Sequence, residues 1–75
     1  MANDFKYEIV KEIKVLSEKN GYTKEINIIK YRDDEPLIDI RKWNKTTDNA
    51  VMLKGVTLTK DEFIALKECI NDIDF

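Results

Sequence analysis

The sequence contains no histidine, one cysteine, one proline and two glycines. A lone cysteine, Cys69, excludes an intramolecular disulfide, and a zinc site lacks its usual ligands. Histidine is also the most frequent general base, and the chain has no glycine-rich phosphate loop. We therefore expect no catalytic residues, no metal and no cofactor, and hence no enzyme.

Long hydrophobic runs are also missing. No apolar stretch approaches the roughly 20 residues that span a bilayer, and the first residues lack the basic start and apolar run of a signal peptide. We expect no membrane association and place the protein in the cytoplasm. A single cysteine agrees with such a reducing compartment, because cytosolic proteins need no disulfide framework.

The chain is short for a folded unit. Its 75 residues are 43% hydrophobic and 37% charged, which predicts one folded domain over residues 1–75. A domain of this size buries only about 60% of its unfolded surface, so it benefits from a disulfide, a metal or a partner subunit. Since neither a disulfide nor a metal is expected, we expect the protein to gain stability by forming an oligomer.

The charge balance counts against a nucleic-acid partner, because 13 basic and 15 acidic side chains give a net charge of −2. The distribution weakens this objection. Residues 22–54 carry seven basic and six acidic side chains, whereas residues 55–75 carry two and five. The acidic excess thus belongs to the C-terminal segment, and a basic face elsewhere can still attract phosphates.

Hydrophobic alternation predicts strands in the first half of the chain. Residues 5–17 fit either a strand or a helix, and we favour a long, bent strand because Ile, Val and Tyr dominate it and Asn20-Gly21 then supplies a turn. A second strand is predicted at residues 23–31. A polar turn leads into a third at residues 37–43, in which Asp39, Arg41 and Trp43 share one face.

The second half of the sequence predicts one more strand and a helix. After a polar loop at residues 44–49, a short strand carries Val56 and Leu58, and Gly55 allows a bulge or a close backbone approach. Thr59 and Glu62 form a capping box that starts a helix. One apolar stripe of that helix must cover a sheet face; it consists of Phe63, Leu66, Ile70 and Ile73.

Basic and aromatic side chains on two of these strands suggest a sheet that binds an unpaired nucleic-acid strand. A base can stack on Trp43 while Arg41 and Lys54 neutralise phosphates. Each residue also has a plainer interpretation: Trp43 as a core filler, Arg41 as the partner of Asp39, and Lys54 as a solvated lysine. Sharing a strand face with Arg41 favours an exposed Trp43.

Three segments resemble the positive transcription cofactor 4 (PC4) family, most closely its short bacterial and phage-encoded, YdbC-like forms. They read Leu-Ile-Asp-Ile-Arg at residues 37–41, Lys-Gly-Val-Thr-Leu-Thr at 54–59 and Ile-Asn-Asp-Ile-Asp at 70–74. The resemblance implies an α+β fold, with a four-stranded antiparallel sheet followed by one C-terminal helix (ββββα). It also implies a homodimer that binds single-stranded DNA across its sheet, and no enzymatic activity.

The resemblance assigns nucleic-acid contacts to six positions. Basic residues of the family motif match Arg41 and Lys54, and aromatic residues match Trp43 and Tyr31, although the eukaryotic members have two adjacent aromatics where this chain has Trp43. Further basic contacts are expected on the second strand. The complete expected set is Lys24, Lys30, Tyr31, Arg41, Trp43 and Lys54.

The chain also departs from the eukaryotic members. The turn at residues 33–35 is acidic where they are basic, and the serine-rich regulatory tail is missing. A coactivator role with RNA polymerase II is therefore not supported, and we expect a role in bacterial or phage transcription, replication or repair. RNA is a second possible ligand, since stacking and phosphate contacts do not sense the 2′-hydroxyl. The alternative function is a protein-interaction adaptor that docks through the acidic helix face of Asp61, Glu68 and Asp72.

Overall fold

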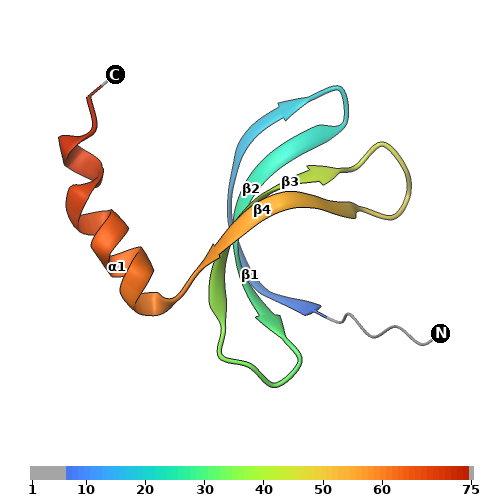
Figure 1. Ribbon diagram of the computed structural model, residues 1–75. Helices are drawn as coiled ribbons and strands as arrows, with labels where there is room; N and C mark the ends of the chain where they lie inside the picture. The colour runs from blue at the N-terminus through green and yellow to red at the C-terminus, as the bar shows by residue number, and fades with distance from the viewer. Residues whose placement is uncertain (1–6, 75) are drawn as a thin grey trace.

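The computed structural model describes residues 7–74, which form one antiparallel sheet followed by a helix (Figure 1). The strands lie side by side in chain order, so each pairs with its neighbour through a hairpin. The predicted ββββα fold is confirmed. The elements are β1 (Tyr7–Lys19), β2 (Tyr22–Tyr31), β3 (Leu37–Asn44), β4 (Val51–Leu58), α1 (Lys60–Cys69) and a final 3₁₀ turn, Ile70–Asp72.

The hairpin between β1 and β2 turns at Asn20 and Gly21, whose φ angles are 55° and 85°. Two consecutive residues with positive φ suit the right-handed twist of the flanking strands, and Asn-Gly is the pair that adopts this conformation most readily. The turn places Lys19 directly opposite Tyr22. The long β1 bends, as predicted, because its pairing with β2 shifts register at three points.

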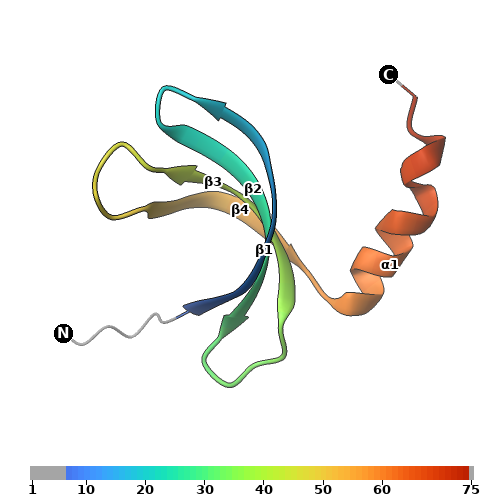
Figure 2. The same ribbon diagram turned by 180° about the vertical axis from the view of Figure 1, so that it is seen from behind.

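The sheet is a single, strongly curved layer (Figures 1 and 2). Side chains alternate between its two faces, and the buried ones lie on the concave face, which we call the inner face. Within residues 7–74 only two hydrophobic side chains are buried, Ile29 and Trp43. The other buried side chains on this face are polar: Thr23, Glu25, Asn27 and Asp39.

The opposite face, which we call the outer face, has two halves. Near the helix it is apolar, with Ile26 and Ile28 on β2 opposite Ile40 and Ile38 on β3. Toward the β1–β2 turn the same rows continue with Lys24 opposite Lys42. The change from isoleucine to lysine follows directly from the sequence of the two strands, because alternate residues share a face.

Strands β3 and β4 approach closely at Gly55, as the glycine predicted. A Cβ atom there would lie 2.1 Å from the Cβ of Arg41, so a larger residue would force the strands apart. A register shift between Arg41 and Trp43 follows in the pairing. The strand β4 is longer than predicted, because it begins at Val51 rather than near Val56.

Helix α1 begins with the predicted capping box: the Glu62 N–H donates to the Thr59 hydroxyl at 3.2 Å, and the Thr59 N–H donates to the Glu62 carboxylate at 2.8 Å. The helix then runs away from the sheet (Figures 1 and 2). Its first turn stays close, since Phe63 lines a pocket with Ile28 and Ile38. Within residues 7–74 no helix is long and apolar enough to cross a bilayer.

Candidate nucleic-acid interface

All three guanidinium nitrogens of Arg41 make hydrogen bonds on the inner face. Its Nε donates to Asp39 Oδ2 at 2.8 Å and its Nη2 to Asp39 Oδ1 at 2.6 Å, which is a bidentate pair with a carboxylate that is not exposed at all. Its Nη1 donates to the carbonyl of Leu53 at 2.8 Å. The hydrogen bonds from the guanidinium to Asp39 raise the pKa of Arg41, so the pair stays charged.

Tyr31 joins the same cluster. Its hydroxyl accepts a hydrogen bond of 3.3 Å from Arg41 Nη2, and its ring centroid lies 6.4 Å from that of Tyr7. Burial raises the pKa of the Tyr31 hydroxyl above its usual value, so the phenol remains a neutral hydrogen-bonding group. Both ring and hydroxyl are thus held by neighbours on the inner face.

Trp43 lies on this face too, and only 2% of it is exposed. Its ring centroid is 6.1 Å from that of Tyr7, and its Nε1 finds no hydrogen-bond acceptor within residues 7–74. The expectation of an exposed ring beside Arg41 is therefore wrong. Alternation placed the two side chains on one face correctly, but burial of Trp43 and Asp39 shows that this face is the enclosed one.

A second polar cluster lies on the inner face near the β1–β2 turn. The Glu25 carboxylate accepts from the Thr23 hydroxyl at 2.6 Å and pairs with Lys45 Nζ at 2.5 Å. Burial alone would raise the pKa of Glu25, but the hydrogen bonds from Lys45, Thr23 and Asn27 and the charge of Lys45 together lower it below its ordinary value of 4.5. Glu25 is therefore a buried, ionised group that fixes the loop after β3.

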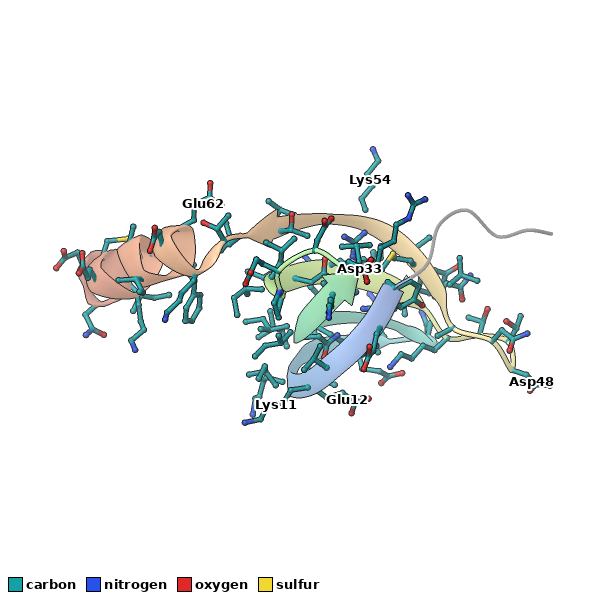
Figure 3. The ribbon with its side chains drawn as sticks, turned by 90° about the horizontal axis from the view of Figure 1, so that it is seen from below. Lys11, Glu12, Asp33, Asp48, Lys54 and Glu62 are labelled. Carbon is teal, nitrogen blue, oxygen red and sulfur yellow. The ribbon has the colours of Figure 1, made fainter. Side chains whose placement is uncertain are left out.

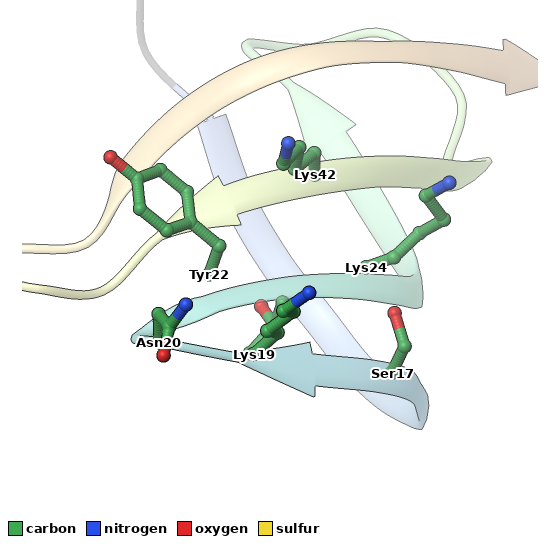
Figure 4. A pocket seen from close by; sticks show the side chains of 7 residues that line it. Ser17, Lys19, Asn20, Tyr22, Lys24 and Lys42 are labelled. Carbon is green, nitrogen blue, oxygen red and sulfur yellow. The ribbon is translucent and has the colours of Figure 1, made fainter.

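Four exposed lysines gather on the outer face. Lys24 on β2 is paired with Lys42 on β3, and Lys54 on β4 lines one pocket together with both. Lys54 projects away from the sheet (Figure 3). A second pocket, of about 390 Å³, adds Lys19 and Tyr22 to Lys24 and Lys42 (Figure 4). We call the four lysines at positions 19, 24, 42 and 54 the lysine patch, and this second pocket the Tyr22 pocket.

The lysine patch is unmixed in charge. Of the residues that the structure describes, no aspartate or glutamate lines either pocket. Lys42 Nζ lies 5.5 Å from the centroid of the Tyr22 ring, in cation–π geometry. The patch therefore combines positive charge with an accessible aromatic ring, although the whole chain carries a net charge of −2.

Comparison with known proteins shows the family to which a chain with this basic and aromatic surface belongs. The family model for Transcriptional Coactivator p15 (PC4) matches residues 18–69, which span β2, β3, β4 and α1. The chain belongs to the PC4 family. Membership points to a protein that binds single-stranded DNA and has a transcription-related role.

A curated relative extends over more of the chain than the PC4 match does. An uncharacterised protein of Treponema pallidum (strain Nichols) is 36% identical over 72 residues, which cover 95% of this chain and 82% of the relative. The similarity thus includes β1, which the family match reaches only at its last two residues.

The structure brings some of the expected contact residues together and separates others. Lys24 and Lys54 meet in the lysine patch, and Arg41 lines the same pocket. The Arg41 guanidinium, Tyr31 and Trp43 lie together on the opposite face of the sheet. Lys30 lies opposite Glu8 in the register of β1 against β2, and it lines a separate pocket with Tyr7 and Arg32.

Three residues of the outer surface were missing from the expected set: Lys19, Tyr22 and Lys42. The sequence contains a signal for two of them. Tyr22 is two residues before Lys24 and so shares its strand face, and Lys42 shares the face of Ile38 and Ile40 in the same way. The pairing of Lys24 with Lys42 depends on the register of β2 against β3, which alternation alone does not give.

Proposed function

We propose that this protein is a non-enzymatic, largely sequence-independent single-stranded DNA-binding protein of bacterial or phage transcription, replication or repair, which acts as a homodimer in the cytoplasm. Membership of the PC4 family supports DNA binding, and the Treponema relative supports a bacterial setting. The observation that carries the proposal is the lysine patch: the outer surfaces of β2, β3 and β4 present Lys24, Lys42 and Lys54 around one pocket.

Electrostatics explains how an acidic chain can bind DNA. Charges separated by more than about 8 Å are largely screened at physiological salt, so a phosphate at the patch responds to the nearby lysines more than to the acidic helix. Each neutralised phosphate of a single strand releases counterions and contributes about −0.7 to the slope of log K against log[salt]. Three lysine contacts predict a slope of about −2.

Titration of the purified protein with fluorescein-labelled oligo(dT) tests the proposal. The anisotropy should report binding whose affinity falls linearly in log[salt] between about 50 and about 200 mM. A hairpin duplex of the same length should bind more weakly, because its bases are paired and cannot be reached for stacking. Tryptophan quenching is a poor readout here, since Trp43 is enclosed.

Lysine variants connect the binding to the patch. Lys24→Ala, Lys42→Ala and Lys54→Ala should each reduce the magnitude of the salt slope by about 0.7. Lys67→Ala, on the helix and outside the patch, is the matched control and should leave the slope unchanged. If no oligonucleotide binds, the proposal is wrong and the adaptor function of the acidic helix face gains support. Oligo(U) should bind as well, because the patch shows no feature that reads a 2′-hydroxyl.

A further inference from the structure

Tyr22 is the exposed aromatic ring beside the lysine patch. It flanks the tight Asn20-Gly21 turn, faces Lys19 across the hairpin, and is 38% exposed, compared with 2% for Trp43. Figure 4 shows the ring rising from β2 at one end of the Tyr22 pocket, with the ammonium groups of Lys24 and Lys42 further along the same face. The ring is therefore available to a ligand while positive charge stands beside it.

We propose that the Tyr22 pocket holds one nucleobase of an unpaired strand, stacked on the Tyr22 ring, while Lys24 and Lys42 contact the phosphates that flank it. This inference rests on the proposed DNA-binding function and names the aromatic platform at which it operates. The expected platform, Trp43, lies on the enclosed face of the sheet, so the stacking role passes to a residue of the outer face.

The dimensions and chemistry of the pocket suit a nucleotide. Its volume of about 390 Å³ lies in the range of small-ligand sites, which begins at about 300 Å³. Ser17 and Asn20 also line the pocket, and their hydroxyl and amide groups can both donate and accept hydrogen bonds at a base edge. Such groups can form hydrogen bonds with any of the bases, which agrees with binding that depends little on sequence.

The cation above the ring does not block it. Lys42 Nζ lies 5.5 Å from the ring centroid, so the group that stands over this π-face is the end of a flexible side chain. A base stacked on an aromatic ring gains more than an exposed ammonium does in a cation–π contact. The base therefore displaces the ammonium from the ring, and the flexible lysine stem lets Lys42 move to the adjacent phosphate.

Substitution of the ring tests the inference. Tyr22→Ala should weaken oligo(dT) binding by about 5- to 150-fold, the range for the loss of one stacked base. The salt slope should not change, since no charge is removed. Tyr22→Phe should retain the affinity because stacking does not require the hydroxyl. Tyr22→Leu keeps an apolar side chain at the position but has no π-face, so it should bind as weakly as Tyr22→Ala.

An abasic oligonucleotide of equal length and charge supplies the matched ligand control. The ratio of oligo(dT) affinity to abasic affinity should be high for the parent protein and markedly smaller for Tyr22→Leu. If the two proteins show the same ratio, or if Tyr22→Leu binds oligo(dT) as tightly as the parent, the inference is wrong while the proposed function stands. If the parent binds neither oligonucleotide, the proposed function itself has failed.

Discussion

Trp43 and Arg41 are two residues apart on β3, and both extend into the concave side of the sheet. The indole lies against Tyr7, and the guanidinium is shared among Asp39, Tyr31 and the Leu53 carbonyl. A phosphate that replaced the buried Asp39 carboxylate at Arg41 would leave that carboxylate without its charge partner. At the residue scale these side chains therefore stabilise the curved sheet.

Substitution of Trp43 should affect stability far more than DNA binding. Trp43→Ala removes the largest buried side chain and should lower the free energy of unfolding by about 3–5 kcal/mol in urea titrations followed by circular dichroism. Trp43→Phe should cost less, since the indole N–H that it removes has no acceptor within the described residues. If Trp43→Phe instead kept full stability and lost oligo(dT) affinity, the ring would be a stacking platform after all.

The same residues show what strand alternation can and cannot predict. It assigned Asp39, Arg41 and Trp43 to one face, and this assignment is confirmed. It could not say which face becomes concave, because curvature arises from the register shifts of β1 and of the β3–β4 pair. The sequence therefore predicts an accessible aromatic ring at Trp43, whereas the structure encloses Trp43 and exposes Tyr22 on the outer face.

At the scale of elements, one ion pair fastens the β3–β4 loop to the sheet. Lys45 follows β3 directly; its N–H donates to the Gly21 carbonyl at 2.7 Å, and its ammonium pairs with Glu25 on β2. Thr46 packs against Gly21 at the same place. The loop thereby covers the β1–β2 turn, which is the turn that positions Lys19 and Tyr22.

This arrangement predicts an acid-sensitive contribution to stability. The pKa of Glu25 is lowered from 4.5 in the folded protein, so its stabilisation is fully present above pH 4.5 and is lost as the pH falls through the folded value. Glu25→Gln should flatten the dependence of melting temperature on pH in the region below 4.5. Thr23→Val, which removes one donor to the carboxylate, should flatten it partly. An unchanged pH dependence in Glu25→Gln would contradict this assignment.

Elements with strong local signals were predicted well, whereas the start of β4, which depends on strand pairing, was not. The capping box fixed the start of α1, and Asn-Gly fixed the first hairpin, because each signal is a contact within four residues. The beginning of β4 was placed too late. Val51 and Met52 form a strand because they pair with Asn44 and Trp43, which the local sequence does not reveal.

At the scale of the whole molecule, a single chain encloses very little apolar surface. Val56 on the sheet and Ile70 and Ile73 after the helix are each at least half exposed. The apolar half of the outer face and the apolar stripe of the helix thus lack a cover within residues 7–74, while the lysine patch lies at the other end of the same sheet.

The proposed homodimer would cover this surface with a second copy of the chain. The dimer would complete the hydrophobic core that the single layer lacks and would leave the lysine patches of both protomers free. Two patches on one particle would also raise the affinity for a strand long enough to reach both.

Sedimentation of the parent and of two matched variants tests this arrangement. The parent should sediment with the mass of two chains. Ile70→Asp places a carboxylate within the apolar stripe and should shift the protein to a monomer, or to an unfolded chain, because burial of an unpaired charge is costly. Ala65→Asp adds the same charge on the other side of the helix and should leave the dimer intact. A parent that sediments as a folded monomer at micromolar concentration would contradict the dimer, and DNA binding would then rest on a single lysine patch.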